Sequence, residues 1–404
     1  VIDVDGVKLG LVICEDVWHS EFVEKTCRAG AQIIVAANAS PFEAGKIAER
    51  EGTILPFIKS CQVPLVYINA IGGQDELVFD GSSFVTDSKG QVFRRLRRFE
   101  EELQVVAVQD MVKPQEPVDL PIGEQARLQE VYEALKLALK DYVTKNGFSQ
   151  VVIGLSGGID SALVTTIAAD ALGAENVLAV MMPTQFTADL SLNLAKQLAE
   201  NLNVKYIVRP IEPLFEAFKR LLAEDFSGRP WDVTEENLQA RIRGTILMAY
   251  ANKFNRLVIT TGNKSETAVG YSTLYGDTAG AFALIKDVYK TDVWALSRYV
   301  NQQKGREVIP EGIINRPPSA ELRVGQKDED SLPTYDRLDM FLKAYVDDRK
   351  AKRQISVDDL DGQVSDGVIR LLHRNEYKRR QSPLGPKLSS RAFGRDWRYP
   401  VCRR

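Results

Sequence analysis

The stretch Gly154-Leu155-Ser156-Gly157-Gly158-Ile159-Asp160-Ser161 decides the fold of the larger part of this 404-residue chain. An apolar run at 150–155 ends in this stretch and is typical of a buried strand. The run at 161–172 has the length and composition of a buried helix. The glycines let backbone N–H groups approach a phosphate closely, and the helix start adds unpaired donors and a positive dipole. The stretch therefore predicts a phosphate-binding loop between a strand and a helix.

The acidic residue of this loop indicates a metal ion. Asp160 would repel a phosphate unless a cation lies between them, so we expect Mg²⁺ here. The loop lacks the lysine of a Walker A motif and the spacing of GxGxxG. It resembles instead the SGGxDS loop of the ATP pyrophosphatase family, which holds the pyrophosphate released when a substrate is adenylated.

Strand-like and helix-like segments alternate on both sides of the loop. This alternation predicts a parallel sheet with helices on both faces, and ligands bind beyond the carboxyl ends of such strands. The segments are helices at 127–146, 161–172, 190–202 and 234–254, and strands at 150–155, 177–182, 205–208 and 257–261.

A second polar loop, 260–266, follows the last of these strands, so we expect it near the phosphate loop. Glu266 is a candidate second Mg²⁺ ligand, and Thr261 is placed to meet the nucleotide. Taken alone, the segment also fits a helix cap, with Ser265 before Glu266.

The chain up to about residue 110 favours a different architecture, built from short β-type runs. Asp5-Gly6 predicts a hairpin turn at its start. Val1 is not an initiator Met, so we expect further residues upstream. Prolines at 113–117 and 121–123 predict a linker. The expected strands are 9–13, 33–37, 65–69, 83–86 and 103–108, with a helix at 43–60 between two of them.

Composition narrows the function classes. Hydrophobic residues make up 44% and charged residues 26%, the balance of an ordinary soluble protein. The net charge of -3 argues against nucleic-acid binding, and no apolar run has membrane-spanning length. His19 and His373 form no metal pattern. Four scattered cysteines without CxxC spacing predict a reducing cytoplasm, with neither zinc nor disulfides: Cys14, Cys27, Cys61 and Cys402.

A set of further motifs makes the resemblance specific. In order and spacing they resemble the NAD+ synthetase family over nearly all of the chain after the linker. One position departs from the ammonia-dependent members, where a lysine precedes the YGD triplet; here it is Leu274. The motifs are SGGIDSA at 156–162, EENLQAR at 235–241, TTGNKSE at 260–266, YGD at 275–277, KDVYKT at 286–291, RPPSAEL at 316–322 and EYKRR at 376–380.

The resemblance implies a role for individual residues. Asp160 and Glu266 would hold Mg²⁺, and Glu266 would also contact nicotinic acid adenine dinucleotide. The remaining dinucleotide contacts would be Asn237, Arg241 and Lys378. ATP and its pyrophosphate would be bound by Gly154, Leu155, Ser156, Gly157, Gly158, Ile159, Asp160, Ser161, Thr261, Lys290 and Ser319.

Cys14 ends the apolar run at 11–13, where a lone cysteine is commonly a small core residue. The segment LVICEDVW at 11–18 nevertheless resembles the nucleophile region of nitrilase-type glutaminases. In that family Cys14 would attack the glutamine side-chain amide, form a thioester and release ammonia. Ser40 and Lys46 would hold the amino-acid end of glutamine. The family's glutamate base and lysine lie upstream of the cysteine and match no position here, so a protein beginning at Val1 would lack glutaminase activity.

The fold expected is α/β: a partial nitrilase-type α/β sandwich followed by a Rossmann-like parallel-sheet ATP pyrophosphatase domain with a helical C-terminal extension. The domains expected are 1–112 for the glutaminase part, 113–125 for the linker and 126–404 for the synthetase. The resemblance implies a cytoplasmic, homo-oligomeric ligase that amidates nicotinic acid adenine dinucleotide to NAD+, using ATP, Mg²⁺ and glutamine or ammonia. Two alternatives stay open: another SGGxDS amidotransferase, and a non-catalytic dinucleotide-binding paralogue.

Overall fold

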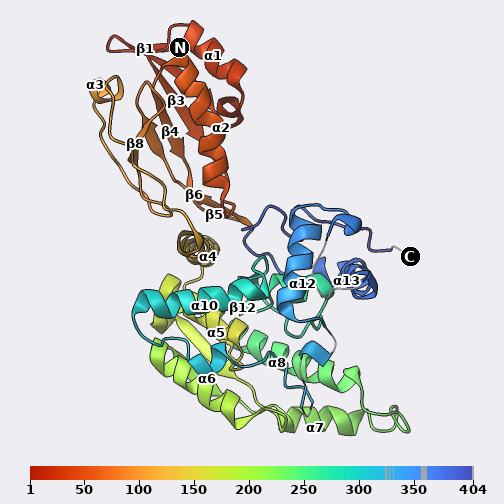
Figure 1. Cartoon of the computed structure of the whole chain (residues 1–404). Helices are drawn as coiled ribbons and strands as arrows, with labels where there is room; N and C mark the ends of the chain where they lie inside the picture. Colours follow the sequence, from red (N-terminus) through yellow and green to blue (C-terminus); the bar gives the residue numbers. More distant parts are fainter. Residues whose placement is uncertain (324, 327, 331, 356–361, 403–404) are drawn as a thin grey trace. The chain divides into compact units, whose positions relative to one another are not determined.

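The computed structural model describes residues 1–323, 325–326, 328–330, 332–355 and 362–402 (Figure 1). The chain divides into two compact units, Val1–Leu137 and Ala138–Arg404. The division falls inside helix α4 (Glu124–Lys145), whose residues contribute to both units. None of the described helices is long and apolar enough to cross a membrane.

The first unit is built on a six-stranded mixed sheet with the order β1-β2-β3-β4-β7-β8. The hairpin at Asp5-Gly6 forms as predicted, and both residues take positive φ. Its elements are β1 (Ile2–Val4), β2 (Val7–Ile13), α1 (Ser20–Arg28), β3 (Ile33–Asn38), α2 (Lys46–Cys61), β4 (Leu65–Asn69), β5 (Ile71–Gln74), β6 (Leu77–Asp80), β7 (Phe84–Thr86), β8 (Val92–Arg95) and α3 (Val108–Met111).

The two faces of this sheet are covered differently. Helices α1 and α2 pack Val23, Ile54 and Ile58 against one face and exclude water from it (Figure 1). On the other face Leu11, Ile13 and Ile68 are 53%, 70% and 49% exposed. The first unit therefore buries one side of its sheet much more fully than the other.

The predicted strand at 103–108 is wrong. Residues 101–107 form no strand, and a short helix, α3, begins at Val108. Leu103 and Val105 are 93% and 97% exposed, so their alternation with polar neighbours packs on no core. Strand β8 already pairs with β7, and the 103–108 segment gains no ladder partner.

The second unit is the predicted parallel sheet, in the order β11-β10-β9-β12-β13. Helices α7 and α8 pack on one face, whereas α5, with α6 and α10 beside it, covers the other (Figure 1). Its elements are β9 (Val151–Gly154), α5 (Ile159–Leu172), β10 (Val177–Met181), α6 (Asp189–Leu202), β11 (Lys205–Val208), α7 (Glu212–Leu221), α8 (Val233–Phe254), β12 (Leu257–Thr260), α9 (Lys264–Val269), β13 (Phe282–Ala283), α10 (Lys290–Lys304), α11 (Glu311–Ile314), α12 (Tyr335–Leu342), α13 (Gly362–Arg374) and α14 (Glu376–Arg379).

The strand order creates a switch point between β9 and β12. The chain runs outward from β9 through β10 to β11, then crosses back and places β12 on the other side of β9. Loops that leave two such neighbouring strands diverge and open a crevice between them. The loops at 155–158 and 261–263 are therefore neighbours, as their sequences predicted.

The C-terminal helices pack around α9. Ala268 and Val269 of α9 lie in one core with Leu338 of α12 and Leu372 of α13. Lys264, the first residue of α9, is fully buried, and its ammonium donates to Asp347 at 2.8 Å, to the Ser389 hydroxyl at 2.7 Å and to the Arg391 carbonyl at 3.1 Å. The helical extension is thus part of the unit's core and supports the loop at 260–266.

Candidate functional site

The phosphate loop occupies the four residues between β9 and α5. Gly157 has φ +83°, and a Cβ on it would lie 2.5 Å from the Ser191 carbonyl oxygen, so only glycine fits. The Ser161 hydroxyl accepts from the Ser156 N–H at 3.2 Å and donates to the Gly158 carbonyl at 2.9 Å. These bonds fix the loop at the N-terminus of a 14-residue helix, where backbone N–H groups attract anions.

Three charged side chains from distant segments meet beside the loop. The Lys290 ammonium donates to Asp160 Oδ2 and lies 3.3 Å from Glu266 Oε1. Asn263 Nδ2 donates to Asp160 Oδ1 at 2.9 Å, and Asn263 also caps α9. The loops after β9 and β12 and the start of α10 are thereby tied into one network.

Burial and neighbouring charge shift the pKa values of this network in opposite directions. Burial, with the negative charges of Asp160 and Asp328, raises the pKa of Glu266 to about 8, although Lys290 opposes the rise. Burial alone would lower the pKa of Lys290, but Asp160 and Glu266 raise it above its ordinary value. Lys290 therefore stays protonated between the acidic side chains of Asp160 and Glu266.

The carboxylates suit a hard cation such as Mg²⁺, which prefers oxygen ligands. Asp160 and Glu266 approach a common point, since both contact the same Lys290 ammonium. Within the described residues, no group of three or more His, Cys, Asp or Glu side chains is arranged to hold a metal ion. A cation at Asp160 and Glu266 would therefore complete its ligand shell with phosphate oxygens and water.

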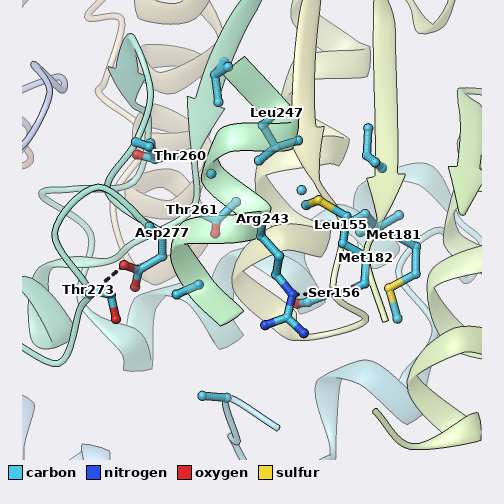
Figure 2. A pocket seen from close by; sticks show the side chains of 18 of the residues that line it. Leu155, Ser156, Met181, Met182, Arg243, Leu247, Thr260, Thr261, Thr273 and Asp277 are labelled. Atoms are coloured by element: carbon cyan, nitrogen blue, oxygen red, sulfur yellow. Dashed lines mark hydrogen bonds between the residues drawn. The ribbon is translucent and has the colours of Figure 1, made fainter. Parts of the chain in front are cut away.

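A cavity of about 250 Å³ opens next to the loop, between β9, β10 and α8. Figure 2 shows Arg243 projecting into it beside Ser156 and Met182, with Leu247 and Thr261 also on the wall. Arg243 Nε donates to the Met182 carbonyl at 2.9 Å, and burial lowers its pKa to about 10. The cavity combines apolar walls with a fixed cation, which fits a nucleoside better than a bare phosphate.

A second cavity, of about 210 Å³, contains the phosphate loop itself. The structure gathers most of the predicted ATP and metal residues on its wall: Ser156, Gly157, Gly158, Ile159, Asp160, Ser161, Thr261, Glu266, Lys290 and Ser319. Gly154 and Leu155 line the first cavity, which Ser156 and Thr261 also border.

The residues expected to bind the dinucleotide do not all line these two cavities. Asn237 and Arg241, on α8, do not line these two cavities but hold the segment after α9: Asn237 accepts from the Thr273 hydroxyl at 2.6 Å, and Arg241 donates to the Leu274 carbonyl at 3.2 Å. The Lys378 ammonium donates to two carbonyls, those of Gly270 and Ser272, both at 2.7 Å. Their binding roles stay predictions.

In the first unit, Cys14 follows β2 with φ +47°, a left-handed backbone that is strained for a cysteine. It is half-buried and begins the single-turn helix Cys14–Trp18. Sharp turns of this kind hold a nucleophile clear of the strand that presents it.

Ser40 and Lys46 lie near the carboxyl end of β3. Ser40 is buried and its N–H donates to Asn69 Oδ1 at 2.8 Å, while Lys46 begins α2 and is half-buried. Tyr67, on β4, is buried, and burial raises its pKa, a rise that the nearby Arg50 opposes.

Similarity to known proteins shows the family of this chain. A family model for NAD synthase matches residues 131–382, and one for carbon-nitrogen hydrolase matches 1–115. The glutamine-dependent NAD(+) synthetase of Acinetobacter baylyi is 48% identical over 98% of this chain and 73% of its own length. The chain belongs to the glutamine-dependent NAD+ synthetase family. The Thermotoga maritima member is 43% identical over 100% of this chain and 76% of its own length.

A solved glutamine-dependent NAD+ synthetase, from Acinetobacter baumannii in complex with ADP, has a TM-score of 0.72 at 41% identity; the match covers 99% of this chain and 73% of that one. Family and fold class are therefore as predicted. The site residues of this NAD+ synthetase family member, and its domain limits at 112 and 125, stay predictions.

Sequence reasoning missed several residues of this synthetase site. Arg243 stands inside a long helix and carries no local signal. Asp277 belongs to the YGD triplet, yet its bond from the Thr273 N–H at 2.6 Å and the desolvation that raises its pKa to about 6 follow only from the fold. Arg316 and Glu321 of the RPPSAEL motif pair with each other, and both contact the Ser191 hydroxyl at the phosphate loop. Their shared motif was the available signal.

Proposed function

We propose that this chain catalyses the ATP-dependent amidation of nicotinic acid adenine dinucleotide to NAD+. One observation carries the proposal: the SGGxDS loop, Asp160, Glu266 and Lys290 meet beside a nucleoside-sized cavity at the switch point of the sheet. A carboxylate oxygen of the nicotinate attacks the α-phosphorus of ATP, and pyrophosphate leaves. Ammonia then attacks the acyl carbon of the adenylate, AMP leaves, and NAD+ remains after loss of a proton.

The chain's own residues act mainly through electrostatics and positioning. The N–H groups of the phosphate loop and the Lys290 ammonium stabilise the negative charge that develops on the leaving pyrophosphate. Mg²⁺ held by Asp160 and Glu266 would add Lewis-acid charge neutralisation there. Ser319, which lines the same cavity, would bind a phosphate oxygen. Holding the two nucleotides in line removes much of the entropic cost of their encounter.

The dinucleotide and glutamine sites complete the proposal. Asn237, Arg241, Glu266 and Lys378 would bind nicotinic acid adenine dinucleotide. In the first unit, the Cys14 thiolate would attack the side-chain amide of glutamine, with Ser40 and Lys46 holding the amino acid. Ammonia would leave as the thioester forms, and water would then hydrolyse the thioester to glutamate. We also propose a cytoplasmic location and a homo-oligomeric state, in line with the family resemblance.

The deciding experiment measures NAD+ formation from ATP, Mg²⁺ and nicotinic acid adenine dinucleotide, with either ammonium or glutamine as the nitrogen source. NAD+ and AMP formed in equal amounts with ammonium would support the synthetase reaction. Turnover with glutamine as well would support the role of Cys14. Absence of turnover with both nitrogen sources would overturn the proposal and favour the non-catalytic alternative, whereas pyrophosphate release with a different acid would favour another SGGxDS amidotransferase.

A further inference from the structure

Helix α10, which begins at Lys290, is capped by side chains from other segments. Its N-cap residue, Tyr289, provides no side-chain hydrogen bond to the first turn. Two other segments provide these bonds instead. The Lys290 N–H donates to Ser265 Oγ at 2.9 Å, and the Thr291 N–H donates to Asp339 Oδ2 at 2.8 Å. The first turn of α10 is therefore capped by side chains from α9 and α12.

The two capping side chains are bonded to each other. The Ser265 hydroxyl donates to Asp339 Oδ1, so the single carboxylate of Asp339 accepts from α9 through one oxygen and from α10 through the other. Ser265 is 0% exposed and Asp339 is 1% exposed. Water does not compete for these bonds, and each acceptor has a fixed donor.

These bonds connect Asp339 to two residues of the phosphate site, Glu266 and Lys290. Ser265 directly precedes Glu266, and Lys290 is the first residue of α10. Fixing the Ser265 hydroxyl and the first amides of α10 thus fixes the backbone on which Glu266 and Lys290 stand. A carboxylate is also favourable there because the N-terminus of a helix carries a positive dipole.

The same face of α12 contacts the Lys290 side chain. Tyr335 lies four residues before Asp339, and its ring centroid is 5.2 Å from the Lys290 ammonium. The Tyr335 hydroxyl donates to Asp328 Oδ2 at 2.8 Å. Helix α12 therefore holds Lys290 at its backbone through Asp339 and at its charged end through Tyr335.

We propose that Asp339 is a positioning residue of the synthetase site, which sets the distance between Glu266 and Lys290 from outside the cavity. The kinetic part of its test rests on the proposed amidation. The structural part does not.

The test compares Asp339→Asn with Asp336→Asn. Both remove one charge from α12, but Asp336 is exposed whereas Asp339 is buried. An asparagine places an amide N–H₂ where one carboxylate oxygen accepted, so one of the two bonds is lost. We expect Asp339→Asn to lower kcat for ammonium-dependent NAD+ formation about tenfold to a hundredfold, as for partners that orient metal ligands. KM for nicotinic acid adenine dinucleotide should change less than about twofold, and Asp336→Asn should leave both constants nearly unchanged.

A second readout uses hydrogen exchange of peptides that cover the start of α10, measured by mass spectrometry without substrates. Asp339→Asn should speed exchange there relative to the wild type and to Asp336→Asn, because one amide oxygen cannot accept from both the Ser265 hydroxyl and the Thr291 N–H, which weakens the cap on the first turn of α10. Unchanged exchange in folded Asp339→Asn would overturn the inference even if the wild-type chain has no synthetase activity. An inactive wild type with faster exchange in the variant would reject the proposed function and keep the capping role.

Ser265→Ala gives an independent variant if Asp339→Asn does not fold. It removes the hydroxyl that joins the Lys290 N–H to Asp339 while leaving the carboxylate in place. The same fall in kcat and the same local exchange are expected. A folded Ser265→Ala protein with wild-type kcat and wild-type exchange would contradict the proposal.

Discussion

The phosphate site of the second unit and the Cys14 site of the first unit are organised differently. In the second unit the charged side chains are bonded to one another and to buried supports, as the Asp160, Lys290 and Glu266 network shows. In the first unit Cys14 depends mainly on a strained backbone, and the neighbouring Ile13 is 70% exposed. The comparison indicates that bonded charged groups organise the synthetase site, whereas a left-handed turn after β2 positions the cysteine.

The largest effect is expected from Asp160→Asn, which tests whether the bonded network serves catalysis. Loss of the charge should lower ammonium-dependent turnover about a thousandfold, the upper range for removing one preorganised electrostatic group. ATP binding, measured by calorimetry, should persist because the loop N–H groups remain. Asp170→Asn, which changes an acid at the other end of the same helix, is the control. Equal turnover in the two variants would break the comparison.

Lys290→Met tests the stability of the same network. The variant leaves the half-buried side chains of Asp160 and Glu266 without a cation between them, which should lower the free energy of unfolding by about 3 kcal/mol. Urea unfolding measures the loss, and Lys304→Met, on the exposed end of α10, is the control. Millimolar Mg²⁺ should recover part of the loss, because a cation again lies between the carboxylates. An unfolding free energy equal to that of the control would show that the pairing is not stabilising.

Asp277→Asn tests whether a titrating carboxylate in the second unit makes the stability of the protein depend on pH. Partial desolvation raises the pKa of Asp277 from 3.8 to about 6, so the folded state binds a proton more tightly than the unfolded chain. Wild-type stability from this group therefore falls as pH rises from about 4 to 6, and the penalty persists above pH 6. The asparagine variant should be more stable than the wild type at pH 8, by less than about 1 kcal/mol because water screens the exposed carboxylate, and no more stable at pH 4.

Thermal or urea unfolding at several pH values gives the result, with the exposed Asp225→Asn as reference. A stability difference between Asp277→Asn and the wild type that does not change with pH would exclude Asp277 as the titrating group.

Cys14→Ser should have the smallest effect on the synthetase reaction. Ammonium-dependent turnover should change less than about twofold, because the thiol takes no part in adenylation. Any glutamine-dependent turnover should disappear, and Cys61→Ser should leave both rates nearly unchanged. A large fall in the ammonium-dependent rate of Cys14→Ser would show that the two sites are not separable in this way.

The sequence predicts those parts of the fold whose signals are local. The loop at 154–161 lies between a strand and a helix as expected, and alternation along the chain predicts the parallel sheet. The two polar loops follow neighbouring strands, so their proximity is also predictable. Local alternation fails at 103–108 because a strand needs a partner, and the pattern alone does not reveal whether one is free.

Long-range contacts of the site are harder to predict. Lys290 meets Asp160 across 130 residues of sequence, and Asp339 meets Ser265 across 74. Each of these residues has an ordinary alternative role, in a helix cap or on a charged surface. Only the packing of α10 and α12 against the sheet and α9 selects the observed role.

The buried Lys264 has a consequence for how the protein is made. Its ammonium needs the Arg391 carbonyl, 127 residues further along the chain, and the adjacent Ser265 and Glu266 take their places from the same loop. At about 5–20 residues per second, ribosomes need roughly 6 to 25 seconds to synthesise that interval. During this time the Lys264 ammonium still lacks one of its hydrogen-bond acceptors. The loop at 260–266 can therefore take its final place only after residue 391 has been synthesised.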